Sequence, residues 1–167
     1  MQLINHAYDN ENGLFAFLQK QCFATCKTVL IQIFCGTGDM SILQPVLDAV
    51  ARYLPHAHVI DVSTAGEISD GQMSEDRIVL SCALFQHAVV ETLHIQEATF
   101  ASGKSIAQRL VTPDTRALIC FTEGLNSDPE GFLQGLAAHC ASAVVAGSNA
   151  ADNNRFEKIA VFDCQNR

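Results

Sequence analysis

Two short segments combine small residues, polar side chains and an acid in a way that suits ligand binding. The first, residues 63–67, reads Ser-Thr-Ala-Gly-Glu, and the second, residues 147–152, reads Gly-Ser-Asn-Ala-Ala-Asp. Each follows a short apolar run, and loops at the carboxyl ends of strands are where open α/β sheets bind ligands. Two tight turns without a ligand would account for the same residue types.

These residue types suit a zwitterion. The acids Glu67 and Asp152 could hold an ammonium group, while hydroxyl, amide and backbone N–H groups could hold a carboxylate. Together they would select a small molecule such as an amino acid or a related metabolite. The candidate ligand-binding residues are Ser63, Thr64, Ala65, Gly66, Glu67, Gly147, Ser148, Asn149 and Asp152.

A third segment offers a nucleotide site. Residues Ala98 to Ser105 read Ala-Thr-Phe-Ala-Ser-Gly-Lys-Ser, which fits the looser Walker A pattern with Ala in place of the first Gly. A phosphate cradle needs backbone N–H groups around a Gly-rich loop, and this segment has one Gly and a bulky Phe100. An ATP- or GTP-binding enzyme that uses Lys104 is one alternative, and Ser102 as a plain helix cap is the other.

Histidines and cysteines indicate no metal site. The close pair His56 and His58 follows a predicted helix end, where a cation is favoured, so a solvated cap is expected. Cys22 and Cys26 lack the second pair of ligands that structural zinc needs. His139, on a predicted helix, could be a haem axial ligand or an ordinary helix residue.

Catalytic residues do not form a complete set. Cys35 is the only thiol expected to be exposed in a Gly-rich turn, and no Gly-x-Ser-x-Gly motif is present. Four acids near predicted loops could serve general acid–base chemistry, namely Glu67, Asp70, Glu123 and Asp152. Their separation in sequence does not show whether they lie close together. We therefore expect a protein without enzymatic activity.

Composition limits the class of protein. The chain has 167 residues, of which 49% are hydrophobic and 17% charged, so we expect a folded domain with a substantial core. A formal net charge of −8 without a basic stripe argues against nucleic acid as a partner. Seven cysteines, mostly in apolar runs, predict reduced core thiols. With no signal-type start and no long apolar run, we expect a cytoplasmic protein that does not insert into membranes.

Hydrophobic periodicity predicts an α/β fold, a mixed β-sheet with flanking helices in an α/β sandwich. Four helices are expected, near residues 15–23, 42–54, 102–110 and 128–140. Seven strands are expected, at residues 28–34, 58–62, 78–85, 88–97, 117–121, 143–146 and 158–164. The third and fourth of these strands should form an antiparallel hairpin through Gln86 and His87. Asp128 should cap the last helix, with inward-facing residues Phe132, Leu133, Leu136 and Ala137.

At the two ligand-type segments the chain resembles the FIST family of bacterial sensory domains. Members carry a strand that ends in Ser-Thr-Ala-Gly-Glu and a later Gly-Gly-small-small-Asp turn. Here residues 59–68 read VIDVSTAGEI and residues 144–152 read VVAGSNAAD, and the resemblance extends over about residues 29–161. The family usually has Gly-Cys where this chain has Asp61 and Val62, and a second Gly at the position of Ser148.

This resemblance implies an intracellular sensory domain of a bacterial signal transduction protein that binds an amino acid or a related metabolite. Residues 1–27 would be an N-terminal helical extension, and residues 28–167 the FIST N-terminal sensory domain, truncated before its C-terminal half. The implied partners are that C-terminal half and a signalling output domain or protein. Some FIST proteins look like haem-based nitric oxide sensors, so haem is the alternative cofactor, although no axial histidine maps onto this sequence.

Overall fold

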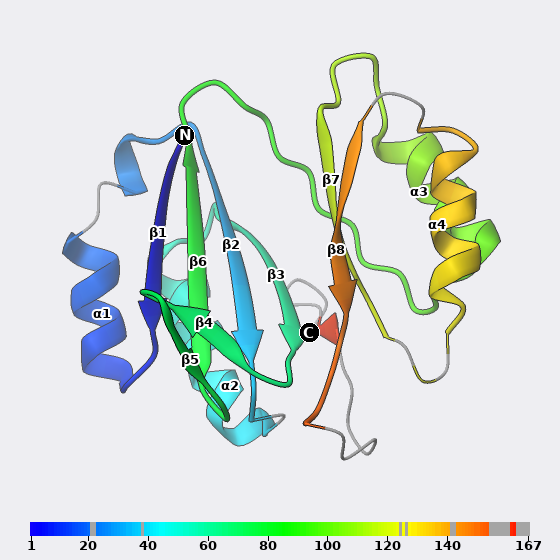
Figure 1. Ribbon diagram of the computed structural model, residues 1–167. Helices are drawn as coiled ribbons and strands as arrows, with labels where there is room; N and C mark the ends of the chain where they lie inside the picture. Colours follow the sequence, from blue (N-terminus) through cyan, green and yellow to red (C-terminus); the bar gives the residue numbers. More distant parts are fainter. Residues whose placement is uncertain are drawn as a thin grey trace.

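The structure, a computed structural model, describes residues 1–20, 23–37, 39–123, 125, 127–140, 143–153 and 161–162. Its helices and mixed sheets confirm the predicted α/β class (Figure 1). The elements follow one another as β1 (Gln2–Ala7), α1 (Glu11–Lys20), the short 3-10 helix η1 (Phe23–Thr25), β2 (Thr28–Cys35), α2 (Met40–Tyr53), β3 (His58–Ser63), β4 (Glu67–Ser69), β5 (Gln72–Ser74), β6 (Ile78–Phe85), α3 (Phe100–Leu110), β7 (Ala117–Thr122), α4 (Pro129–Ala137), β8 (Val144–Asn149) and β9 (Val161–Phe162).

The larger sheet has five strands in the order β1-β6-β2-β3-β9. β2 and β3 are parallel, while the other neighbouring pairs are antiparallel. Alternate residues of β2 and β6 point to one face, where α1 and α2 bury their apolar stripes against them. This main core includes Leu14 and Leu18 of α1, Ile31 and Ile33 of β2, Leu43 and Val46 of α2, and Leu80 and Cys82 of β6.

A second, smaller sheet pairs β7 with β8 in parallel, and α3 and α4 lie side by side next to it (Figure 1). Its core is formed by Ala98, Ile106, Ala107, Phe132 and Leu136. The two helices approach so closely that a Cβ on Gly103 would overlap the carbonyl of Phe132, and a Cβ on Gly135 would overlap the carbonyl of Phe100. Glycine at both positions therefore permits this crossing.

Long apolar runs and clear caps gave correct predictions. The strands expected at 28–34, 58–62, 78–85 and 117–121 match β2, β3, β6 and β7 to within one residue. Asp128 caps α4 as predicted, because its Oδ1 accepts a 2.9 Å hydrogen bond from the backbone N–H of Gly131. Pro129 is the first residue of that helix.

The predicted hairpin of 78–85 with 88–97 is wrong. Both edges of β6 are already hydrogen-bonded, one to β1 and the other to β2, so no edge is left for a third strand. Residues 88–97 instead form an irregular connection from the larger sheet to α3. Their alternating pattern has another cause, since Leu93 and Ile95 pack on the second core.

The N-cap of α3 is Thr99 rather than Ser102. The hydroxyl of Thr99 accepts from the backbone N–H of Ser102, and the hydroxyl of Ser102 accepts from the backbone N–H of Thr99. Such a reciprocal capping box places the N-cap three residues before the position that we expected for it.

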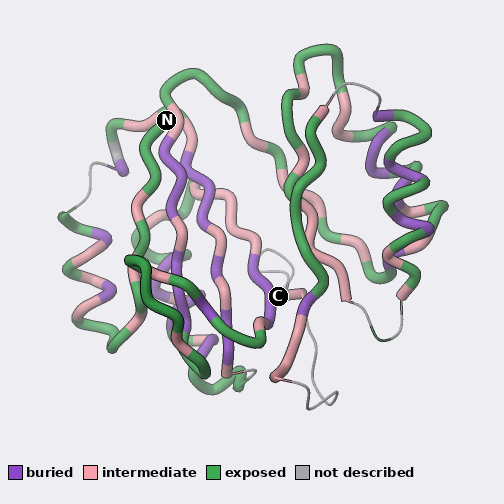
Figure 2. Tube along the Cα trace, viewed as in Figure 1, coloured by how far each residue is buried: buried purple, intermediate pink, exposed green. Residues whose placement is uncertain are grey.

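Burial differs from expectation in the second part of the chain. The strand expected to be buried at 143–146 is β8, which runs to Asn149 and is exposed along its whole length (Figure 2). β8 lies at the edge of a sheet in which, among the described strands, it pairs with β7 alone. Leu133 and Ala137, expected to face inward, are exposed as well, because α4 buries Phe132 and Leu136 instead.

Three strands were not predicted. β1 lies in the segment expected to be only helical, and its alternation is masked by the polar residues Asn5 and His6. β4 and β5 have three residues each, too few for periodicity to show. β9 falls within the strand expected at 158–164, whose remaining residues lie outside the described part of the chain. No helix in the described ranges has the length and apolarity to cross a membrane.

Candidate functional site

The structure brings the two predicted ligand-type segments together. Residues 63–67 begin at the carboxyl end of β3, beside the end of its parallel neighbour β2, and the N–H of Thr64 donates to the carbonyl of Cys35 at 3.0 Å. From the other sheet, the N–H of Ala151 donates to the carbonyl of Ser63 at 2.9 Å. The loop that follows β8 thereby reaches across to the end of β3 (Figure 1).

The second segment starts as strand and ends as loop. Gly147, Ser148 and Asn149 belong to β8, and Oδ1 of Asn149 accepts a 2.6 Å hydrogen bond from the hydroxyl of Thr122 on β7. The N–H of Ala150 donates to the carbonyl of Thr122 at 2.8 Å, which extends this pairing by one residue. The chain then crosses to β3 and places Asp152, half-buried, next to the loop 63–67.

Glu67 is buried, with 3% of its surface exposed. Its Oε1 accepts a 2.5 Å hydrogen bond from the hydroxyl of Thr64, and its Oε2 accepts a 3.2 Å bond from the backbone N–H of Arg77. Gly36 lies against the same carboxylate. Glu67 therefore joins three segments, the turn after β2, the loop after β3 and the turn before β6, and a direct contact with a ligand would require these bonds to rearrange.

The remaining predicted residues differ in accessibility. Ser63 is buried, whereas Thr64 and Asp152 are half-buried, and the exposed members are Ala65, Gly66, Gly147, Ser148 and Asn149. Gly147 has a structural reason to be glycine, since its φ is +152° and a Cβ would overlap the carbonyl of Cys120. A ligand at this place would thus meet mainly Thr64, the backbone of Ala65 and Gly66, and the side chains of Asn149 and Asp152.

Sequence reasoning missed three polar residues near these loops. Asp61 of β3 is fully buried, two residues before Ser63, and a buried acid is stable only with compensating interactions. Asn153, which has a φ of +55°, donates from Nδ2 to Oδ1 of Asp76 at 3.3 Å and so ties the second loop to the turn before β6. An acid inside the apolar run of β3 was the one visible signal.

The structure gives little support to the predicted nucleotide, thiol and haem sites. From Phe100 onward the Walker-like segment is helical, the strand expected before it is absent from the described structure, and Gly103 serves the packing of α3 on α4. Cys35, expected to be exposed, is completely buried, and its Sγ lies 3.6 Å from the hydroxyl of Thr37. His139 is exposed just beyond α4. The described residues contain no group of three side chains that could hold a metal ion.

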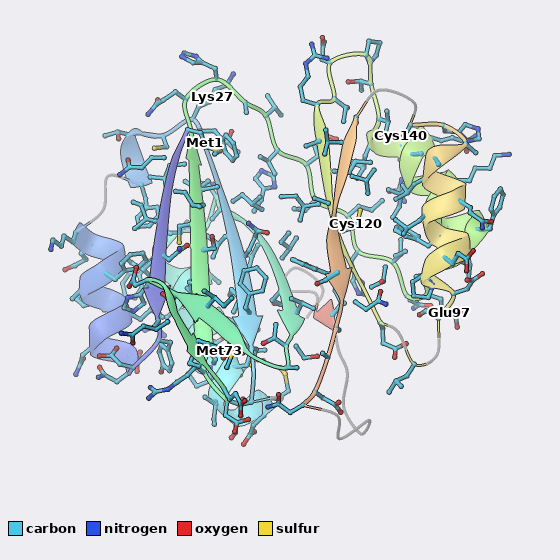
Figure 3. All side chains as sticks on the ribbon, viewed as in Figure 1. Met1, Lys27, Met73, Glu97, Cys120 and Cys140 are labelled. Carbon is cyan, nitrogen blue, oxygen red and sulfur yellow. The ribbon has the colours of Figure 1, made fainter. Side chains whose placement is uncertain are left out.

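Burial shifts the pKa of two thiols. Desolvation raises the pKa of Cys82, in the main core, to about 12. Desolvation, and to a smaller extent the neighbouring thiol of Cys140, raises the pKa of Cys120 to about 11. Figure 3 labels Cys120 at β7 and Cys140 just beyond α4. Both shifted thiols are therefore protonated at neutral pH, as expected of core residues.

Polar loops at the carboxyl ends of parallel strands lie where open α/β sheets commonly bind ligands. The family model of the FIST N domain matches residues 29–167, which include both loops. The chain belongs to the FIST N domain family, which consists of sensory domains of signal transduction proteins. No curated protein and no solved structure shows a significant match to the chain.

Proposed function

We propose that this chain senses a small zwitterionic metabolite, of the amino acid type, with the loops that follow β3 and β8. The observation that carries the proposal is the hydrogen bond from Ala151 to Ser63, which joins these loops although they are more than 80 residues apart in sequence. A molecule that touches both loops would report on the relative position of the two sheets.

The side chains supply complementary charges for such a molecule. The carboxylate of Asp152 would accept from the ligand's ammonium group, in a protein whose net charge of −8 already favours cations. The hydroxyl oxygen of Thr64, whose proton is donated to Glu67, would accept from the same ammonium group. The ligand's carboxylate would be held by the amide N–H of Asn149 and the exposed backbone of Ala65 and Gly66. Glu67 would not contact the ligand but would support the site, because its two hydrogen bonds fix the shape of the loop 63–67.

Sensing then requires no chemical step, and we propose that the domain is not an enzyme and acts inside the bacterial cell. A ligand shifts the balance between two arrangements of the loops only by binding one of them more tightly. The arrangement selected in this way would be read by a C-terminal FIST half or by an output domain.

A thermal-shift screen of amino acids tests the proposal. A ligand at 100 times its Kd adds about 2.7 kcal/mol, which in a domain of this size raises Tm by about 5–10 °C. The variant Asp152→Asn should lose most of this shift, measured from the variant's own Tm without ligand. The matched control is Asp114→Asn, an exposed acid in the turn before β7, which should respond like the parent.

Four outcomes would contradict the proposal. If an amino acid raised the Tm of Asp152→Asn and of Thr64→Ala as much as it raised the Tm of the parent, the binding site would lie elsewhere. A screen that also contains haem and Mg-ATP covers the alternatives: a Soret band lost in His139→Ala would indicate a haem sensor, and a magnesium-dependent ATP shift lost in Lys104→Ala would indicate a nucleotide site. Silence from every amino acid would exclude the ligand class for this chain.

A further inference from the structure

The hairpin of β4 and β5 presents two large apolar side chains to solvent. The strands are antiparallel and turn through Asp70 and Gly71, which have φ values of 52° and 75°, as a tight two-residue hairpin turn requires. Ile68 and Met73 are directly opposite each other across the two strands. Their exposed fractions are 74% and 76%, and Figure 3 shows Met73 on the hairpin in front of the sheet.

The two side chains are exposed because the hairpin turns its polar face, not its apolar face, toward the sheet. Side chains alternate along a strand, so Glu67 and Ser69 point to the opposite face from Ile68. Glu67 is buried, and the hydroxyl oxygen of Ser69 is buried without a hydrogen-bond partner among the described residues. β4 contacts β6 and β1, and the hairpin lies across the sheet (Figure 1). A hairpin that packs on a sheet normally buries its apolar face, whereas this one buries its polar face.

Acidic residues flank the apolar pair along the chain, at both ends of β5. Asp70 is in the turn of the hairpin, and Glu75 and Asp76 follow β5 directly; all three residues are exposed. The one basic residue in this stretch is Arg77, so residues 68–77 carry more negative than positive charge. Apolar anchors inside a charged rim are the arrangement found at protein–protein contacts.

We propose that Ile68 and Met73, with the rim of Asp70, Glu75 and Asp76, form a docking surface for a basic amphipathic helix of a partner protein. The apolar stripe of such a helix would cover the two side chains, and its Lys or Arg residues would face the acidic rim. A second copy of this chain fits less well, because its own acidic rim would face the first in molecules of net charge −8. This surface is separate from the ligand site and goes beyond the proposed function.

The hairpin also adjoins the ligand loop. β4 begins at Glu67, the residue that holds the loop 63–67 to its neighbours. A partner at Ile68 and Met73 would therefore contact the chain one residue away from the loop that we assign to the ligand. Docking itself does not require the ligand, so the two proposals can fail independently.

The probe for this surface is a fluorescently labelled synthetic helical peptide of leucine and lysine, titrated with the protein and followed by fluorescence anisotropy. The double variant Ile68→Ser, Met73→Ser should bind at least about tenfold more weakly, as expected when interface anchors are removed. The control Leu133→Ser removes another exposed apolar side chain, on α4, and should leave binding unchanged. The variant Asp70→Asn, Glu75→Gln should weaken binding several-fold and flatten its salt dependence.

Three results would overturn the proposal. Equal peptide binding by the parent and the Ile68→Ser, Met73→Ser variant would show that the hairpin is not the binding surface. Equal binding of a leucine–glutamate peptide would show that the acidic rim plays no part. A concentration-dependent dimer in sedimentation equilibrium that disappears in the double variant would make a second copy of this chain the occupant. Because both side chains are exposed, the double variant should keep the parent's Tm, which separates lost binding from lost folding.

Discussion

Gly36 lies directly against the carboxylate of Glu67, so that a Cβ at position 36 would overlap its Oε1 and come within 3.0 Å of the backbone nitrogen of Asp76. The turn after β2 and the loop after β3 are thus packed together around one buried acid. This relationship explains why the sequence has glycine at position 36 and an acid at position 67, two features that look independent when the chain is read in order.

Gly36→Ala should destabilise the protein, because the added methyl group can fit only if Glu67 gives up its hydrogen bonds or the turn at Asp76 shifts. We expect a loss of about 1–3 kcal/mol in the free energy of unfolding, measured by urea denaturation. Gly66→Ala is the matched control, since its Cβ would meet only the carbonyl of Ser74 at 3.3 Å. Equal effects of the two substitutions would contradict the close packing at Gly36.

Gly135→Ala tests the crossing of α3 and α4. Helix propensity alone predicts that alanine stabilises α4 by about 1 kcal/mol. The added Cβ would however overlap the carbonyl oxygen of Phe100, which belongs to rigid helix backbone, so we expect a net loss of about 2–4 kcal/mol. Gln134→Ala, on the exposed side of the same helix, should change stability by less than about 0.5 kcal/mol. A stabilised Gly135→Ala variant would show that the helices do not touch there.

The pH dependence of stability should report on His6. Burial lowers the pKa of His6 below its ordinary value of 6.5, and Asp9 offsets part of this effect. The unfolded chain therefore binds the proton more readily than the folded one. The contribution of neutral His6 to the free energy of unfolding is therefore fully present above pH 6.5. It is lost as the pH falls from there through the pKa of His6 in the folded state.

His6→Phe should reduce this loss, because a phenyl ring can keep the stack on Phe17, whose centroid lies 4.4 Å from that of His6, without a proton to bind. The measurement is the urea midpoint at several pH values between about 7.5 and 5. His87→Gln, at an exposed position, should leave the profile of the parent unchanged. Identical acid profiles of the parent and His6→Phe would show that His6 does not control this transition.

Cysteine alkylation should follow burial. With a pKa of about 12, Cys82 has about one thiolate in ten thousand at pH 8, and with a pKa of about 11, Cys120 has about one in a thousand. Of these two thiols and the half-buried Cys26, Cys26 should therefore react first with iodoacetamide, followed by Cys120 and then Cys82. Peptide mass spectrometry of timed samples gives the order, and urea-unfolded protein should remove the differences. Early labelling of Cys82 in native protein would contradict its place in the core.

Elements with a strong local signal were predicted correctly from the sequence. β2 and β6 are continuous apolar runs, α2 has a complete apolar stripe, and Asp128 with Pro129 marks the start of α4. Each of these signals lies within a few neighbouring residues, where periodicity and capping act. The motif at residues 63–67 likewise identified the family.

Pairing and burial could not be predicted in this way. The alternation at 88–97 is typical of a strand. The edge of β6 that such a strand would need is paired instead with β1, which lies more than 70 residues away from β6 in sequence. Residues 63–67 and 147–152 were predicted as loops of one site, yet only the fold decides that Glu67 is buried beneath Gly36 while Asn149 is exposed on β8.

The sequence alone therefore determined the α/β class, most of the long elements and the family, because these depend on local patterns. The tertiary structure decided which strand edges are paired, which acid is buried and where the ends of β3 and β8 meet at Ser63 and Ala151. Those features depend on contacts between residues far apart along the chain, and such contacts are selected by the packing of the whole molecule rather than by any single segment.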